Sequence, residues 1–188
     1  MASRGARNLV LGGRSQTISE EAELAIDALK SQGASVTVIP ADITKPEEVQ
    51  RVLSQIDETL PKLVGVIHTA MVLEDKLLVD LDRDTLQRVL RPKMLGGWNL
   101  HQQTLGRELE CFVLFWSLSS VFGHAGQANY SAANAMLDSL AYYRRAQGLP
   151  ALVMNWGHLG DAGYLAEREE LGARLKRQGV LSFSVEQA

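Results

Sequence analysis

The residues best suited to chemistry lie together in one segment, residues 117–134. Ser117 comes directly after the apolar run 112–116, which has the composition of a buried strand. Open α/β sheets bind ligands at the carboxyl ends of their strands, so we expect a reactive side chain here. Tyr130 and Asn134 are four residues apart on a predicted helix and share one face of it. A hydroxyl and a phenol can donate hydrogen bonds to a reacting oxygen, and the phenol can act as a general acid.

The elements that position these residues follow an alternating pattern. Short apolar runs occur at 9–11, 36–39, 63–67, 112–116 and 151–155, with longer helical stretches between them. The runs are continuous rather than alternating, which is typical of strands buried on both faces of a sheet. The order predicts an α/β fold with a doubly wound, Rossmann-like parallel sheet.

Five helices are predicted from their end signals. Thr17 with Glu20 and Thr44 with Glu47 form capping boxes for the first two. Asp82 or Asp84 can cap the third, which runs to about residue 104. The other predicted ranges are 21–32, 46–60, 127–147 and 165–178, with Gly33 and Gly148 as stops.

The composition excludes several classes of protein. The chain has 188 residues, enough for one domain, and its net charge is -3, which argues against a nucleic-acid or anionic-membrane partner. Its single cysteine, Cys111, allows neither an intrachain disulfide nor a metal site built on cysteines. No run approaches the roughly 20 apolar residues of a membrane span. We therefore expect a cytoplasmic protein that uses no metal.

The segment Gly-Gln-Ala-Asn-Tyr-Ser-Ala-Ala-Asn at 126–134 resembles a known family. With Ser117 thirteen residues before Tyr130, it is similar to the short-chain dehydrogenase/reductase superfamily. More narrowly, it resembles the ketoreductase domains of modular polyketide synthases and animal-type fatty acid synthases. Those domains carry Asn where most of the superfamily has Lys, and their lysine lies upstream. Lys93, 24 residues before Ser117, matches that lysine, and the resemblance covers essentially the whole chain.

The resemblance implies NADPH-dependent reduction of a β-ketoacyl thioester to the β-hydroxyacyl thioester. The implied partners are an acyl carrier protein, which holds the substrate on phosphopantetheine, and the other synthase domains. Tyr130 would be the general acid, and the Lys93 ammonium would pull its pKa down from about 10 towards the working pH. Ser117 would give the carbonyl oxygen a second hydrogen bond. Asn134 would hold the helix or a water in a proton relay.

The resemblance also implies a set of cofactor-binding residues. Arg14 matches the residue that faces the 2′-phosphate of NADPH, a role that suits its fork of donors. Asp42 and Ile43 match the pair that contacts the adenine ring. A solvated loop arginine, and a turn aspartate before Thr44, are the alternatives.

Two further segments, after the third and the last strand, match parts of the family that line the cofactor and adjoin its nicotinamide. In the first of them Met71 stands where the family usually has glycine. We interpret His68 as structural or cofactor-lining rather than as a catalytic base. The candidate residues in the two segments are His68, Thr69, Ala70, Asn155 and Gly157.

Leu73-Glu74-Asp75 resembles the Leu-Asp-Asp motif of ketoreductases that give one alcohol configuration, the B type. Asp75 stands at its diagnostic third position. No tryptophan precedes Tyr130 in the loop, which the opposite type would show. The alternative is that Asp75 only caps a short helix.

A glycine-rich loop of the Gly-x-Gly-x-x-Gly kind is not found. Alignment with the family makes the run 9–11 its second strand, so we expect residues 1–188 to form a single, partial ketoreductase domain that lacks the first strand and the last. The first strand would lie between the second and the fourth. We expect weak NADPH binding and low stability of the isolated chain. The alternative functions are a non-catalytic structural remnant of a synthase and a free-standing short-chain alcohol dehydrogenase.

Overall fold

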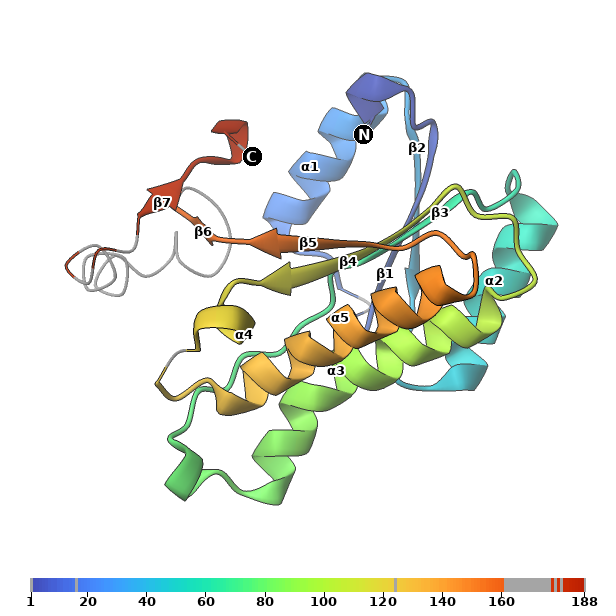
Figure 1. Ribbon diagram of the computed structural model, residues 1–188. Helices are drawn as coiled ribbons and strands as arrows, with labels where there is room; N and C mark the ends of the chain where they lie inside the picture. Colours follow the sequence, from blue (N-terminus) through green and yellow to red (C-terminus); the bar gives the residue numbers. More distant parts are fainter. Residues whose placement is uncertain are drawn as a thin grey trace.

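Parallel strands alternate with helices throughout the computed structural model (Figure 1), which describes residues 2–15, 17–123, 125–160, 177, 179 and 181–187. The main strands are β1 (Asn8–Gly13), β2 (Ser35–Pro40), β3 (Gly65–His68), β4 (Cys111–Ser117) and β5 (Leu152–Trp156). The helices are α1 (Glu20–Ser31), α2 (Pro46–Thr59), α3 (Arg83–Gln103), α4 (Ser119–Phe122) and α5 (Ala128–Ala146). Shorter elements are η1 (Ala2–Arg4), η2 (Leu78–Asp80), β6 (His158–Leu159), β7 (Ser182–Phe183) and η4 (Val185–Gln187).

The strands form parallel sheets, which confirms the predicted Rossmann-like α/β class. One sheet has the order β3-β4-β5, and a second pairs β1 with β2. The register places His68 opposite Leu114, and Ser117 opposite Trp156. The carboxyl ends of β3, β4 and β5 therefore meet at one edge of the sheet, the edge where the sequence predicted a reactive side chain.

The strands β1 and β3 lie in different sheets. Within the described parts of the chain, β1 pairs only with β2, and β3 pairs only with β4. In the alignment expected from the sequence, these two strands are the second and fourth strands, with the first strand between them. Each therefore has one edge without a strand partner among the described residues.

The core of the larger sheet lies between β4 and α5. Phe112, Leu114 and Trp116 are buried on one face of β4 and pack against Leu137 and Leu140 of α5. Figure 1 shows α3 and α5 side by side along this sheet. The alternate residues of β4 are only partly buried, so the prediction of burial on both faces is correct for one face alone.

A second cluster joins the smaller sheet to α3. Val49, Leu53 and Ile56 of α2 are buried, with Val10 and Leu100 packed against them. Two side chains of α3 also donate to backbone carbonyls, one in the loop after β2 and one at the start of α2. The amide of Asn99 bonds the Ile43 carbonyl at 2.9 Å, and that of Gln103 bonds the Pro46 carbonyl at 2.6 Å.

Two of the predicted helix caps are wrong. Ser19, not Thr17, caps α1, because its hydroxyl accepts from the Ala22 amide at 3.2 Å. Thr44 does not cap α2, because its amide and hydroxyl both donate to Asp42 Oδ1 instead. Asp82 caps α3 as predicted, and its Oδ1 accepts from the Thr85 amide at 2.7 Å.

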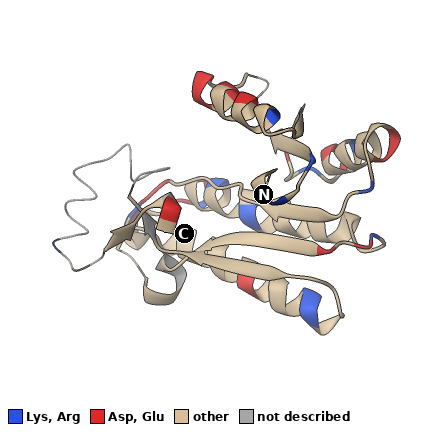
Figure 2. Ribbon diagram, turned by 90° about the horizontal axis from the view of Figure 1, so that it is seen from above, with Lys and Arg blue, Asp and Glu red and all other residues tan. Residues whose placement is uncertain are grey.

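Charge is confined to the helices and loops. None of β1 to β5 contains Lys, Arg, Asp or Glu, as Figure 2 shows. The predicted helix 165–178 falls almost entirely outside the described residues. Among the helices that are described, none combines the length and the apolar character that a membrane crossing requires.

Candidate active site

The structure brings together the four predicted catalytic residues from three elements. Tyr130 and Asn134 lie on the first turns of α5, Ser117 ends β4, and Lys93 comes from the middle of α3. Lys93 and Tyr130 are 3% and 9% exposed. The Lys93 ammonium lies 5.6 Å from the centre of the Tyr130 ring. Two helices and the end of one strand thus bring these side chains together in one largely buried region.

The Lys93 ammonium has a fixed partner. It donates a hydrogen bond of 2.9 Å to the carbonyl oxygen of Phe115 on β4. Burial disfavours the charged form and lowers the pKa of Lys93 to about 8. The amine is therefore mostly protonated at neutral pH.

The pKa of Tyr130 differs from our expectation. Burial, the largest influence, raises the pKa above its ordinary value. Hydrogen bonds with the side chains of Asn134 and Ser117 act in the opposite direction, and the negative charge of Asp75 adds to the increase. The Lys93 ammonium donates to the Phe115 carbonyl and lies 5.6 Å from the centre of the Tyr130 ring. Tyr130 is consequently protonated at neutral pH, which is the form that can donate a proton.

The side chain of Asn134 is fully buried, and only one of its two polar atoms has a hydrogen-bond partner among the described residues. Its amide nitrogen donates to the Tyr130 carbonyl at 2.8 Å, one turn earlier in α5. Its Oδ1 has no hydrogen-bond partner among the described residues. A buried acceptor without a partner costs about 1–3 kcal/mol. Such an atom can accept a hydrogen bond from a water or a ligand, as the proton-relay interpretation requires.

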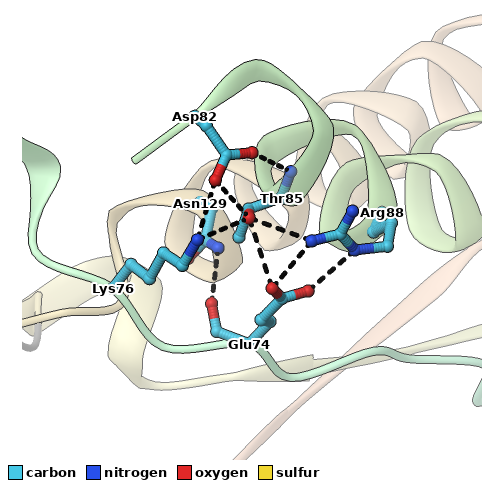
Figure 3. Close-up of polar contacts among 6 residues, drawn as sticks. All are labelled: Glu74, Lys76, Asp82, Thr85, Arg88 and Asn129. Atoms are coloured by element: carbon cyan, nitrogen blue, oxygen red, sulfur yellow. Dashed lines mark hydrogen bonds and ion pairs between the residues drawn. The ribbon is translucent and has the colours of Figure 1, made fainter. Parts of the chain in front are cut away.

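The segment 74–76 lies along the loop that precedes α5. Gln127 donates to Asp75 Oδ2 at 3.0 Å, and the Lys76 amide donates to the Gly126 carbonyl at 2.8 Å. Asn129, buried at the start of α5, donates to the Glu74 carbonyl at 2.9 Å (Figure 3). The nearest short helix, η2, has Leu77 as its cap residue, so Asp75 does not cap it.

A cavity of about 520 Å³ lies where the two sheets meet. Four predicted cofactor residues line it: Arg14, Asp42, Ile43 and Ala70. Burial acts to raise the pKa of Asp42, but hydrogen bonds from Thr44 and the positive charge of Arg14 keep it below the ordinary value. The volume is typical of small-ligand sites, and a guanidinium suits a phosphate. The lining residues therefore fit the adenosine phosphate end of a dinucleotide.

Sequence reasoning missed two arginines on the rim of this cavity. Arg88 and Arg91 line it from α3, with Pro92. The available signal was their spacing of three residues, which places both on the face of α3 that leads to Lys93. With Arg14 on the opposite side, the cavity has three cations.

The remaining predicted cofactor residues do not line the cavity. His68 is 3% exposed and lies beneath Gly96 and Gly97 of α3, 3.6 Å from where a Cβ on either would stand. Burial, and then the Lys93 charge, lower the pKa of His68 to about 4, so it is neutral near pH 7. This placement fits the structural role that we allowed for it.

The other three lie at strand ends. Thr69 follows β3 and is exposed, and Asn155 is an exposed residue of β5. Gly157 lies against the ring of Phe183, whose Cε1 is 2.9 Å from where a Cβ would stand. Their predicted roles at the cofactor stay predictions.

Comparison with known proteins places this geometry in a family. A model of the KR domain matches residues 1–161. The squalestatin tetraketide synthase of a Phoma species is 37% identical over 180 residues, which are 96% of this chain and 7% of that protein. The low-reducing polyketide synthase drtA of Aspergillus calidoustus is 41% identical over 173 residues, 91% of this chain and 7% of that protein.

A solved A-type ketoreductase from a modular polyketide synthase has the same fold. It superposes with a TM-score of 0.92 at 37% identity, and the match covers 100% of this chain and 39% of that one. The chain spans less than a tenth of the length of either curated relative.

Proposed function

The chain belongs to the KR domain family, the ketoreductase domains of polyketide synthases, and from this membership we propose that it reduces a carrier-bound β-ketoacyl thioester with NADPH. We further propose that residues 1–188 are one part of such a domain, working beside an acyl carrier protein and other synthase domains. The observation that carries the proposal is the buried phenol of Tyr130, with Lys93 5.6 Å from the centre of its ring and Ser117 at the end of β4.

The reaction needs a proton donor at the ketone oxygen. NADPH, when bound, supplies the hydride that reduces the ketone carbon. Tyr130 holds a proton at neutral pH and would deliver it to the oxygen as negative charge develops there. Ser117, at the carboxyl end of β4, would donate a second hydrogen bond to the same oxygen. Both donors come from rigid elements, which keeps them oriented before the substrate arrives.

Lys93 and Asn134 would support the proton transfer. Once Tyr130 has given up its proton, the ammonium over its ring stabilises the phenolate. The free Oδ1 of Asn134 would hold a water through which the phenolate regains a proton. Each role uses an atom that is buried beside Tyr130.

The cavity residues would hold the adenosine end of NADPH. Arg14 would bind the 2′-phosphate, and Asp42 with Ile43 would border the adenine. Arg14 and Arg91 line the cavity with positive charge that suits an additional phosphate, whereas Arg88 already pairs with Glu74. We therefore propose NADPH over NADH.

We also propose that the alcohol has the B-type configuration. The proposal rests on Asp75, which stands beside Gln127 and whose charge acts on Tyr130. The A-type ketoreductase noted above shares the fold at 37% identity, a level at which a few loop residues can differ in type.

The test is reduction of a β-ketoacyl group carried on a phosphopantetheine thioester. The chain is mixed with this substrate and either NADPH or NADH, and cofactor oxidation and alcohol configuration are measured. Because weak NADPH binding is expected of the isolated chain, both cofactors are supplied at high concentration. We expect consumption of NADPH, slower consumption of NADH, and one dominant alcohol. A folded chain that consumes neither cofactor would contradict the proposal, and the opposite alcohol would contradict the B-type assignment alone.

A further inference from the structure

Glu74 is held by a polar network on α3 (Figure 3). Arg88 grips its carboxylate with both arms of a fork, Nε to Oε2 at 2.9 Å and Nη2 to Oε1 at 2.8 Å. The hydroxyl of Thr85, which is completely buried, shares its one proton between Oε1, at 3.2 Å, and Asp82 Oδ2, at 2.9 Å. A bidentate fork fixes direction as well as distance. The Glu74 side chain is therefore tied to one place on α3.

The next ion pair along the segment repeats this attachment. The ammonium of Lys76 donates to Asp82 Oδ2 at 2.7 Å and to Thr85 Oγ1 at 3.0 Å. Thr85 thus joins the partners of Glu74 and Lys76 in a single network. Isolated surface ion pairs contribute little, but here several charges converge on one buried hydroxyl.

The backbone of the same segment is bound on its other side to the first turn of α5 and to the loop before that helix. The Asn129 side chain donates to the Glu74 carbonyl, and the Gly126 carbonyl accepts from the Lys76 amide. Asp75 lies between these two points and makes its own contact with Gln127. Its side chain is consequently directed towards the loop that leads into Tyr130, whereas those of Glu74 and Lys76 turn towards α3.

We infer that Glu74 and Arg88 are positioning residues that hold Asp75 in place beside Gln127 and so set the configuration of the alcohol product. The claim about the alcohol configuration rests on the proposed function, whereas the claim about the position of Asp75 does not. Neither residue needs to touch the reacting atoms, because both act through the placement of Asp75.

The test compares Glu74→Gln, Arg88→Gln and the double variant with the unsubstituted chain. The matched control is Asp57→Asn, which breaks another arginine fork, Arg107 Nη1 and Nη2 to the two oxygens of Asp57, both at 2.7 Å. That fork joins α2 to the turn after α3 and involves no residue of the segment 74–76. Melting temperatures of all variants are measured to show that each is folded.

The first measurement is amide hydrogen exchange at Lys76, which needs no turnover. We expect exchange to accelerate about tenfold in Glu74→Gln and in Arg88→Gln, with no further increase in the double variant and no change in Asp57→Asn. Unchanged exchange at Lys76 in both single variants would overturn the inference, whether or not the chain is active.

The second measurement is the ratio of the two alcohol configurations. We expect the ratio to fall about tenfold in both single variants and to stay unchanged in Asp57→Asn. Faster exchange with an unaltered ratio would overturn the stereochemical half. If the unsubstituted chain turns nothing over, the proposed function has failed, and exchange at Lys76 alone decides whether Glu74 and Arg88 position the segment.

Discussion

The central strand of the larger sheet, β4, is buried far more deeply than the two strands of the smaller sheet. Phe112 and Leu114 of β4 are inaccessible to solvent, whereas Leu11 of β1 is 40% exposed and Val38 of β2 is 37% exposed. The strand β4 has a neighbour on each edge and α5 across one face, whereas β1 and β2 pair only with each other among the described strands. A two-stranded sheet alone has little stability in water.

The two sheets carry different parts of the proposed site, one the residues for chemistry and the other the residues for cofactor recognition. The residues proposed for chemistry, Lys93, Ser117 and Tyr130, all belong to the larger sheet and its helices. Arg14 and Asp42 approach the cavity from the smaller sheet. Chemistry is therefore placed on the well-packed region, and cofactor recognition depends on how the two regions fit together.

Removal of the phenol oxygen should break the chemistry of the larger region without disturbing either region's fold. For Tyr130→Phe we expect the reduction rate to fall about 10²- to 10⁴-fold, because the proton donor is lost. Cofactor oxidation and the melting temperature are measured together. Tyr142→Phe, at an exposed position of the same helix, is the control, and an active Tyr130→Phe enzyme would remove the phenol from the mechanism.

Acid should weaken the larger region through His68. Its pKa is about 4 in the folded chain and 6.5 ordinarily, so the unfolded state binds more protons between these values. Stability should therefore fall as the pH drops from 6.5 to 4, by roughly 3 kcal/mol in total. Denaturant melts across this range measure the slope. His68→Gln should flatten it, and an equal slope in that variant would assign the effect to other groups.

Loss of the Arg14 charge should weaken cofactor binding, the role proposed for the smaller sheet, and leave the chemical step unchanged. For Arg14→Gln we expect the KM for NADPH to rise about 10- to 100-fold while the KM for NADH changes little, because only NADPH has a 2′-phosphate. The control Arg4→Gln makes the same charge change at an exposed position, beyond the opposite end of β1 from Arg14. An equal rise for both cofactors would show that Arg14 does not bind the 2′-phosphate.

An added methyl group on α3 should push the two regions apart. A Cβ on Gly96 would stand 2.5 Å from Ile43 Cδ1, so Gly96→Ala should lower the free energy of unfolding by about 1–3 kcal/mol and weaken NADPH binding. Thermal melts and cofactor titration measure both effects.

The second substitution Ile43→Val should recover part of this loss, because it removes Cδ1. Gly106→Ala has open space around the new atom and is the control. A Gly96→Ala variant with the melting temperature and NADPH affinity of the control would mean that Ile43 moves aside without a measurable cost in stability.

Much of the fold could be predicted from local patterns. All five apolar runs are strands, because β-branched and apolar residues in short runs specify strands wherever helices flank them. The cap of α1 was misassigned because Thr17 and Ser19 are both good cap residues, and only the backbone geometry selects one. The uneven burial of the two sheets depends on which strands become neighbours, which no local pattern reports.

The site was predictable only in part. The spacing of Ser117, Tyr130 and Asn134 indicated one site because a strand end and a helix face are local features. Lys93 entered only through the family resemblance, since it is distant in sequence. The predicted direction of the Tyr130 pKa shift was wrong because burial raises the pKa by more than the hydrogen bonds with Asn134 and Ser117 lower it. Arg88 and Arg91 were missed because charged helix residues ordinarily face solvent.

Arg88 lines the cavity and also donates two hydrogen bonds to the Glu74 carboxylate. An anion bound in the cavity would therefore share this guanidinium with Glu74. Any anion in the cavity that draws on this cation competes with the carboxylate for it. By thermodynamic reciprocity, the fork weakens binding of that anion by the same free energy by which the anion loosens the fork. Binding of such an anion would then loosen the attachment of the segment that carries Asp75.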